Sequence, residues 1–150
     1  MGKRNLDLLV VFSAPGSMRF GQRGHVLYLS GYEPYFGNSM MIQPLENSAG
    51  PLLQIDEAKH FPSDCTWIED VHDPQDPVKT IKSYLSKAKL NRSRMGLVDE
   101  YSVNPVLLRR IEREFGISNV VCASDILEDA RSVKSEYEIR CVKKACAIAK

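Results

Sequence analysis

The feature that most constrains the fold is an apolar run near the start of the chain. Residues Leu6 to Ser13 read LDLLVVFS, and the breaker cluster Ala14-Pro15-Gly16 follows directly. A short, continuous apolar run that ends in turn-forming residues is typical of a strand with both faces buried. Strands of this kind occur in sheets that carry helices on both faces. The run therefore predicts a buried strand of an α/β sheet.

The rest of the first half of the chain predicts further strands. Four more segments combine apolar, aromatic and β-branched residues, and residues that favour turns separate them. We expect these strands at residues 25–32, 40–45, 51–55 and 65–68. Residues 17–24 are expected to form a loop, and residues 46–50 a hairpin connection.

The second half of the chain alternates helices with strands. Asp76-Pro77 and Asn104-Pro105 each place a side-chain acceptor at an N-cap and a proline at the first helical position. Apolar residues at three- and four-residue spacing follow both pairs, which predicts two amphipathic helices, the second closed by Gly116. Further strands are expected at residues 95–98 and 117–123. This order predicts a single α/β domain of three layers, with a mixed β-sheet flanked by helices.

A further helix is predicted at the end of the chain. Ser135 and Glu138 have the spacing of a capping box. Behind them, apolar residues recur at helical spacing, and no glycine or proline ends the pattern before Lys150: Ile139, Val142, Cys146 and Ala149. Because natural helices seldom stop within such a stripe, we expect a fragment whose last helix packs against a downstream part of the protein.

Composition and charge exclude several classes of function. The 150 residues contain 20 Lys and Arg against 19 Asp and Glu, a formal net charge of +1. The chain therefore lacks the basic excess typical of nucleic-acid-binding proteins. No apolar run approaches the ~20 residues that cross a bilayer. The polar start Met1–Asn5 precedes an apolar stretch too short for a signal peptide, so we expect a cytoplasmic protein with no membrane partner.

The cysteines predict neither a zinc site nor a disulfide framework. Cys65, Cys122, Cys141 and Cys146 form no Cys-x-x-Cys pair. We expect free thiols, as is usual in the cytoplasm, with Cys122 a small core residue in its strand.

The residues capable of metal binding or acid–base catalysis are scattered along the predicted turns and helix surfaces. They are Asp56, Glu57, His60, Asp64, Glu69, Asp70, His72, Asp73 and Asp76. A two-metal hydrolytic site needs several carboxylates that converge. We interpret the densest group, residues 69–73, as the acidic exit of a strand, and His25 and His60 as surface residues. No Gly-x-Ser-x-Gly or Gly-x-Gly-x-x-Gly motif is present, so we expect no catalytic or metal-binding residue in this chain.

Two segments carry a resemblance to a known family. The stretch Arg131-Ser132-Val133-Lys134-Ser135, followed by Glu138-Ile139, resembles the link between the two domains of the creatinase, prolidase and aminopeptidase P family. The stretch Tyr28-Leu29-Ser30-Gly31-Tyr32 is similar to the signature that closes the second strand of that family's N-terminal domain.

The resemblance implies a domain organisation and a reaction. Residues 1–131 would form the N-terminal domain, which has a ribonuclease H-like motif. Residues 132–150 would form the link and the first helix of a C-terminal "pita-bread" metallohydrolase domain. In the family that domain holds two divalent ions, commonly manganese, cobalt or zinc, on two Asp, one His and two Glu. The resemblance thus implies no cofactor within these 150 residues, a parent protein that cleaves Xaa-Pro bonds, and a homodimer.

The resemblance also implies candidate substrate-binding residues. Tyr35-Phe36-Gly37-Asn38 is similar to a loop of creatinase that reaches the substrate bound in the neighbouring subunit. Tyr35, Phe36 and Asn38 are the corresponding candidates here. Asn38 stands where creatinase has an arginine, and an amide offers no charge to a carboxylate, which disfavours creatine as the substrate.

Two alternatives to a peptidase stay open on the sequence alone. The parent could be a creatinase-type amidinohydrolase. It could also be a metal-free protein-binding module, since a histone-chaperone subunit has the same two-domain architecture. The partners implied by the main reading are the chain's own C-terminal catalytic domain, a second copy and a peptide substrate, with no nucleic acid.

Overall fold

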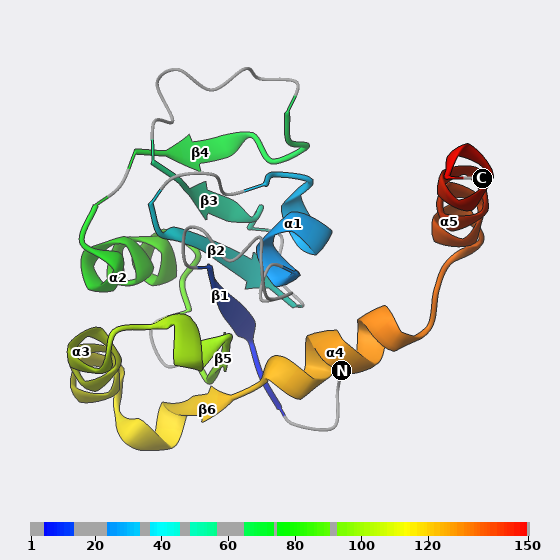
Figure 1. Cartoon of the computed structure of the whole chain (residues 1–150). Coiled ribbons are helices and arrows are strands. Elements are labelled where there is room, and N and C mark those ends of the chain that lie inside the picture. The colour runs from blue at the N-terminus through cyan, green and yellow to red at the C-terminus, as the bar shows by residue number, and fades with distance from the viewer. Residues whose placement is uncertain are drawn as a thin grey trace.

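A computed structural model describes residues 5–13, 24–33, 37–45, 49–56, 65–73, 75–90 and 93–149 (Figure 1). The strands are β1 (Leu8–Ser13), β2 (Ser39–Pro44), β3 (Leu52–Gln54), β4 (Asp70–His72), β5 (Met95–Val98) and β6 (Val120–Cys122). The helices are α1 (His25–Ser30), α2 (Pro77–Lys87), α3 (Pro105–Phe115), α4 (Ser124–Ser132) and α5 (Glu136–Ile148).

The strands form one mixed sheet in the order β4-β3-β2-β1-β5-β6. The first three strands pair antiparallel, as β1 with β2 and β2 with β3. Strands β5 and β6 continue the sheet parallel to β1, and β4 adds a parallel edge strand beside β3. This arrangement confirms the predicted α/β fold with a mixed sheet.

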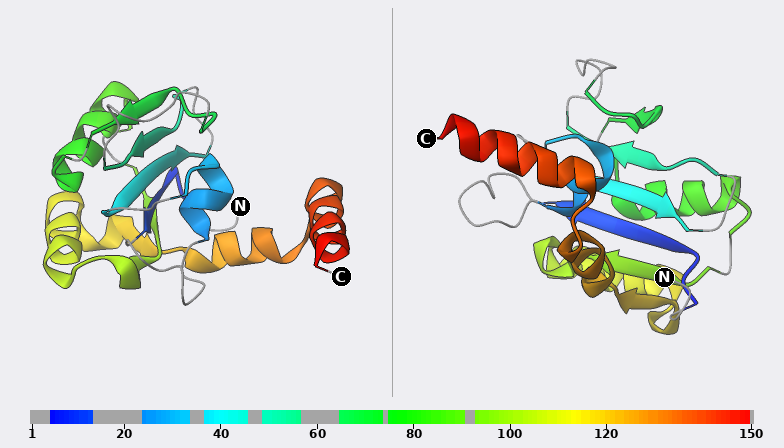
Figure 2. Two further views of the ribbon diagram at one scale, coloured as in Figure 1. Left: turned by 45° about the horizontal axis from the view of Figure 1, so that its top comes forward. Right: turned by 90° about the vertical axis from the view of Figure 1, so that its right-hand side faces the viewer.

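The sheet is the middle of three layers. In β1, Leu8, Val10 and Phe12 belong to the core under α2 and α3. Leu9 and Val11 belong to the core under α1 and α4 on the opposite face. Figures 1 and 2 show these two pairs of helices on opposite sides of the sheet. All six residues of β1 are buried, which confirms the prediction made from the apolar run.

The predicted helix starts are confirmed. Asp76 Oδ1 accepts the backbone N–H of Val78 at 3.0 Å, and Asn104 Oδ1 accepts that of Val106 at 2.8 Å. A proline follows each cap, as predicted. The capping box of α5 is also present, with Ser135 and Glu138 each bonding the other's backbone N–H.

The prediction of a strand over residues 25–32 is wrong, because this segment contains helix α1. Its β propensity is overridden by tertiary packing, since Val26 is buried against the sheet while Tyr28 is 42% exposed. Gly31, at φ 75°, closes the helix by donating its N–H to the Leu27 carbonyl. The Tyr28–Tyr32 signature therefore lies at a helix end, and His25, predicted at the surface, is only 5% exposed.

The short strand predicted at residues 65–68 is also misplaced. The strand of this region is β4, at Asp70–His72. The preceding residues instead bind the end of α1, where Thr66 Oγ1 donates to the Ser30 carbonyl at 2.6 Å. The indole N–H of Trp67 donates to the Leu29 carbonyl at 2.7 Å. These bonds satisfy carbonyls that the helix leaves without intrahelical partners.

The last part of the sheet is shorter than predicted. Residues Ile117–Asn119 form a 3₁₀ turn, and only Val120–Cys122 pair with β5. Cys122 lies in the edge strand and is exposed, so its predicted place in the core is wrong. Its thiol donates to Glu100 Oε1 at 2.8 Å. The sequence does not predict helix α4. Leu127 is its one fully buried apolar side chain, so the segment lacks the long apolar stripe that indicates an amphipathic helix.

Gly96 provides a test of this packing. A Cβ at Gly96 of β5 would lie 2.6 Å from Ala123 Cβ and 2.8 Å from Leu9 Cδ2. We expect Gly96→Ala to lower the free energy of unfolding by about 1–3 kcal/mol, the usual effect of overpacking a core. Urea unfolding followed by circular dichroism measures this change. Gly50→Ala is the matched control, since a Cβ there meets nothing within 4 Å. Equal stability of the two variants would contradict this close packing of Ala123 and Leu9 against Gly96.

Candidate functional site

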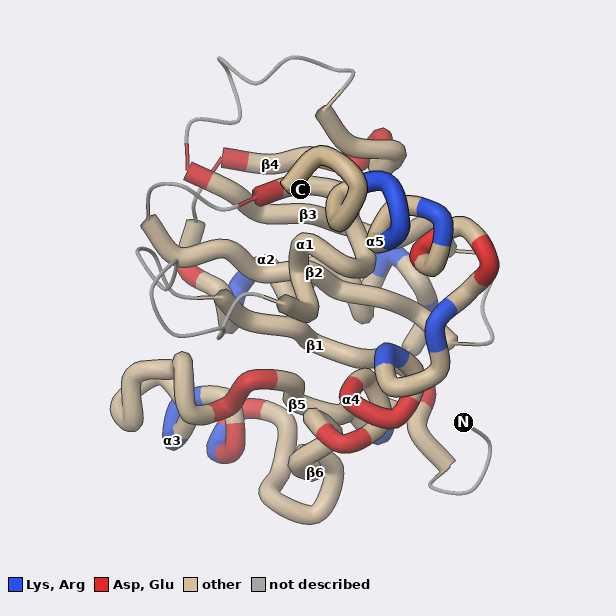
Figure 3. The backbone as a smooth tube through the Cα atoms, turned by 45° about the vertical axis from the view of Figure 1, so that its right-hand side comes forward, with Lys and Arg blue, Asp and Glu red and all other residues tan. Residues whose placement is uncertain are grey.

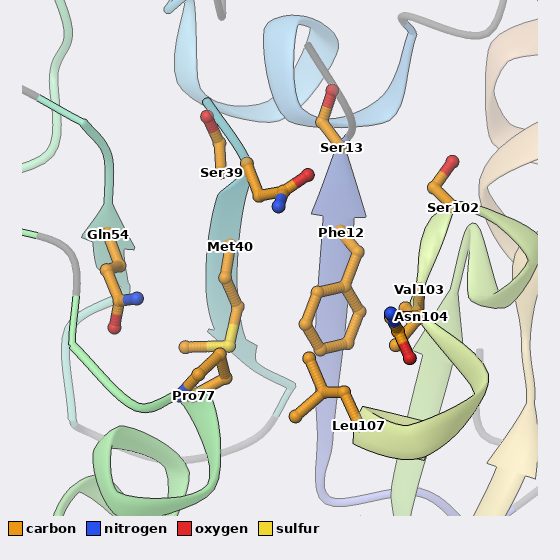
Figure 4. A pocket seen from close by; sticks show the side chains of 11 residues that line it. Phe12, Ser13, Ser39, Met40, Gln54, Pro77, Ser102, Val103, Asn104 and Leu107 are labelled. Carbon is orange, nitrogen blue, oxygen red and sulfur yellow. The ribbon is translucent and has the colours of Figure 1, made fainter. Parts of the chain in front are cut away.

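A pocket with a volume of about 90 Å³ opens where β1 ends and β2 begins (Figure 4). Strands β1 and β5 run parallel, and their carboxyl ends meet at this edge of the sheet. The starts of α2 and α3 lie at the same edge. The lining residues are Phe12, Ser13, Asn38, Ser39, Met40, Gln54, Pro77, Ser102, Val103, Asn104 and Leu107. Open α/β sheets commonly bind ligands beyond the carboxyl ends of their strands, so the location suits a binding site.

The inner wall of the pocket is apolar. Phe12 and Met40 are paired across β1 and β2 and are 5% and 2% exposed. Pro77 from the start of α2 and Leu107 from the first turn of α3 complete this wall. By this measure a cavity of about 10–15 Å³ holds one water molecule, so the pocket has room for several water molecules or for one small aliphatic group.

The rim of the pocket is polar and uncharged. Asn104 uses its oxygen to cap α3, which leaves its amide nitrogen as a donor. Gln54 is already held, because its nitrogen donates to the Gln75 carbonyl at 3.0 Å and its oxygen accepts from Thr80 at 2.7 Å. None of the described lining residues carries a charge. The pocket is therefore suited to a neutral group that is apolar at its tip and accepts a hydrogen bond at its base.

Two buried hydroxyl groups lie at the same edge of the sheet. Ser13 and Ser39 are paired across β1 and β2 and are 4% and 1% exposed. Neither hydroxyl has a hydrogen-bond partner in the described part of the chain. Side chains alternate along a strand, so both hydroxyls lie on the α1 side and not beside Phe12 and Met40 (Figure 4). Among the described residues, they hold unused hydrogen-bonding capacity behind the pocket.

An ion pair fixes the start of α2 to the middle of α3. Arg110 Nη2 of α3 lies 2.5 Å from Asp76 Oδ2, while the other oxygen of Asp76 caps α2. The hydrogen bond from Arg110 is the main reason that the pKa of Asp76 lies below its usual value. Asp76 is thus ionised at neutral pH, and it connects the two helices that border the pocket.

The predicted substrate-binding residues are placed only in part. Tyr35 and Phe36 lie outside the described residues. Asn38 lines the mouth of the pocket, and it is exposed. Gly37 beside it has a φ of 64°, and a Cβ there would lie 0.9 Å from Asp56 Oδ2. The positive φ and the nearby Asp56 side chain both favour glycine at position 37. The backbone at Gly37 therefore helps to set the position of Asn38.

The acidic and histidine residues named above stay dispersed in the part of the chain that the structure covers. No three His, Cys, Asp or Glu side chains there come together as metal ligands would. His72 and Asp70 form an exposed pair on β4, with 2.6 Å between Nε2 and Oδ1. Residues Glu57, His60 and Asp64 lie outside the described ranges.

Sequence reasoning missed most of the pocket. Phe12, Met40 and Leu107 carry only the signal of core residues, and nothing local indicates that they meet at an opening. The sequence correctly predicts Asn104 as a helix cap. It does not indicate that the same side chain also lines the rim of the pocket.

Charged residues of both signs are spread over the described helices. Basic and acidic residues both occur along α3, α4 and α5 (Figure 3). None of the helices described is long and apolar enough to cross a membrane.

Comparisons with known proteins agree on the fold. An X-Pro aminopeptidase from Thermotoga maritima MSB8 matches with a TM-score of 0.65 and 23% identity, over 93% of this chain. The matched region is 37% of the Thermotoga chain, so the present chain spans little more than a third of that protein. An XXA-Pro aminopeptidase from Streptococcus pyogenes matches with a TM-score of 0.55 and 14% identity, over 82% of each chain. No curated protein matches the sequence.

The sequence itself matches a family model. The model of the Creatinase/Prolidase N-terminal domain covers residues 1–133, which include the whole sheet and helices α1 to α4. The match and the three-layer fold agree with the motif at Arg131–Ser135. The chain therefore belongs to the creatinase/prolidase N-terminal domain family.

Proposed function

We propose that this chain is the non-catalytic N-terminal domain of a metal-dependent peptidase that cleaves Xaa-Pro bonds. The observation that carries the proposal is the family match over residues 1–133. The two similar solved structures, an X-Pro aminopeptidase and an XXA-Pro aminopeptidase, support peptides rather than creatine as the substrate class. In this proposal the domain walls the active site, restricts the substrates that enter and contributes to a homodimer in the cytoplasm.

Helix α5 is the proposed connection to the catalytic domain. Its apolar residues Ile139, Val142 and Ile148 are 42%, 58% and 78% exposed. Figure 2 shows α5 standing away from the sheet and from the other helices. We assign residues 1–131 to the N-terminal domain and residues 132–150 to the link and first helix of a pita-bread domain. Burial of the α5 stripe against that domain would remove apolar surface from water.

The metal chemistry belongs to that second domain. Two Asp, one His and two Glu of that domain would hold a pair of manganese, cobalt or zinc ions, which would supply Lewis-acid chemistry and an activated water molecule. The described residues offer no set of three ligands for such ions, so no step of the reaction is assigned to them. Their contribution in this proposal is restricted to binding and shielding the substrate.

The pocket and its neighbouring loop are the proposed points of substrate selection. The apolar wall around Phe12 and Leu107 fits an aliphatic side chain or a proline ring. The amides of Asn38 and Asn104 at the rim can bind a peptide carbonyl without requiring a charge. Tyr35 and Phe36 would add apolar cover beside Asn38.

The proposal predicts that the chain alone has no peptidase activity. Xaa-Pro dipeptides with added manganese or cobalt should give no turnover, whereas the chain extended through its downstream coding sequence should be active. The same downstream sequence should supply two Asp, one His and two Glu as ligands. Their absence would favour the metal-free binding module, and cleavage of creatine by the extended protein would favour an amidinohydrolase. Metal-dependent turnover that copurifies with the 150-residue chain would contradict the proposal.

The proposal also predicts a substrate effect of the pocket and loop in the extended protein. Phe36→Ala, Asn38→Ala and the pocket-narrowing Leu107→Phe should raise KM, with kcat changed much less, because the metal ligands are elsewhere. The loss in kcat/KM should correspond to about 1–3 kcal/mol, as for one apolar contact in a pocket. Leu108→Phe is the matched control, since Leu108 lies in the same helix, is also half-buried and does not line the pocket. If all four variants behave as the wild type on every peptide, the loop and pocket have no part in selection.

A further inference from the structure

A polar cluster on the face opposite the pocket joins α1, the end of β5 and α4. The Arg131 guanidinium, from the last turn of α4, lies 3.3 Å from His25 Nδ1 and 5.5 Å from the centre of the Tyr28 ring. On its other side, His25 Nε2 lies 3.6 Å from Asp99 Oδ1. The cluster is largely closed to solvent, because His25 and Asp99 are 5% and 2% exposed.

Gly24 leaves the space that Arg131 occupies. A Cβ on Gly24 would lie 1.8 Å from Arg131 Nη1 and 2.5 Å from its Cζ. The φ of Gly24 is −115°, which side-chain-bearing residues adopt freely. Glycine is therefore needed here for room and not for its backbone freedom. Gly24, His25 and Tyr28 together form what we call the arginine socket.

Asp99 anchors the far side of the socket. It is held in the left-handed region, with φ 58° and ψ 41°, immediately after β5. The Tyr101 hydroxyl donates to Asp99 Oδ1 at 2.7 Å, and the backbone N–H of Asp99 donates to Ser124 Oγ at 2.9 Å. Asp adopts this conformation more readily than most side-chain-bearing residues, and the two hydrogen bonds hold Asp99 in place. The socket is thus built against the carboxyl end of β5.

Arg131 stands at the boundary between the domain and the link. Leu127, one turn earlier, is the last fully buried side chain of α4. From residue 132 to residue 149, every residue is exposed except the half-buried Glu138. The Arg131 carbonyl accepts a hydrogen bond from Lys134 Nζ, so the same residue contacts the link through its backbone.

We propose that Arg131 is a positioning residue whose seat in the arginine socket sets the direction in which residues 133–135 and α5 leave the domain. The guanidinium fixes the last turn of α4 against α1, and α1 packs on β1 and β2. Without it, the last turn of α4 loses this contact with α1 and is free to fray. The inference rests on the proposed function in one respect, namely that α5 carries the next domain.

Native cysteines allow a direct measurement of this direction. Cys65, beside the end of α1, and Cys141, on α5, are both exposed. Spin labels at these two positions, in a chain with Cys122→Ser and Cys146→Ser, report the distance between domain body and helix by double electron–electron resonance. We expect one narrow distance distribution. Arg131→Ala should broaden it at least twofold, and so should Gly24→Ala, whose methyl group takes the place of the guanidinium.

The double variant makes the test specific to the socket. In the Arg131→Ala background the socket is empty, so adding Gly24→Ala should broaden the distribution no further. Arg140→Ala is the matched control, because Arg140 also lies over a tyrosine, Tyr137 at 5.9 Å, but within α5 alone. Near-ultraviolet circular dichroism verifies that each variant is folded. Should Arg131→Ala fail to fold, Arg131→Lys keeps the charge, removes the planar fork and should give the same broadening.

Three results would overturn the inference. They are a broad distribution in the unsubstituted chain, unchanged widths in folded Arg131 and Gly24 variants, and equal broadening by Arg140→Ala. None of these bears on the family membership or on the peptidase proposal, because the measurement needs no catalytic domain. Conversely, an inactive extended protein with a narrow distribution would contradict the peptidase proposal and leave the positioning role intact.

The socket also predicts a dependence of stability on pH. Arg131 can only donate, so His25 Nδ1 must accept and the ring must be neutral. Burial is the main cause that lowers the pKa of His25, and Arg131 lowers it further, against Asp99 and Glu128, which raise it. A histidine with a lowered folded-state pKa contributes stability that is present above its unfolded pKa, about 6.5, and is lost as the pH falls through the folded value.

The urea midpoint should therefore fall more in the unsubstituted chain than in His25→Gln on going from about pH 7 to about pH 5. Burial raises the pKa of Asp99, which acts in the opposite direction but is present in both proteins. Glu100, next to Asp99, is likewise common to both. Parallel pH profiles of the two proteins would show that His25 is not held neutral by the socket.

Discussion

The burial of β1 on both faces is the constraint on which the rest of the structure depends. Each of its residues is removed from water, so the sheet must be covered by helices on either side. Strand β1 pairs antiparallel with β2 and parallel with β5. The start of β2 and the carboxyl end of β5 therefore both lie beside the carboxyl end of β1. The pocket and the arginine socket lie at that end, on opposite faces. Both features are consequences of where β1 stops.

The two faces of the sheet use different means to hold their helices. On the pocket face, α2 and α3 are long and amphipathic, and the ion pair of Asp76 with Arg110 joins the start of α2 to the middle of α3. On the other face, α1 and α4 are short and bury few apolar residues, so a polar cluster around His25 supplements the packing. Gly96 leaves room for Ala123, the residue before α4, because a Cβ on Gly96 would lie 2.6 Å from Ala123 Cβ.

These differences suit the two roles proposed for the domain. A substrate-selecting pocket benefits from walls that do not move, since loose positioning of contacts weakens discrimination. A link to a second domain needs a defined exit direction, which the short α4 cannot supply through apolar packing alone. The arginine of the family's link motif thereby acquires a physical function in this chain, separate from the capping box that starts α5.

The sequence by itself determined the features that depend on local chemistry or on strong periodicity. These are the buried strand β1, the Asx-proline starts of α2 and α3, the capping box at Ser135 and the three-layer class. Only the tertiary structure decided the helical state of residues 25–30, because a β-prone segment follows the face it must bury. It also decided that β6 is an exposed edge, that Asn104 borders a pocket and that Arg131 enters a space left by Gly24. Contacts of this kind join residues far apart in the chain, and no local pattern records which distant residues will meet.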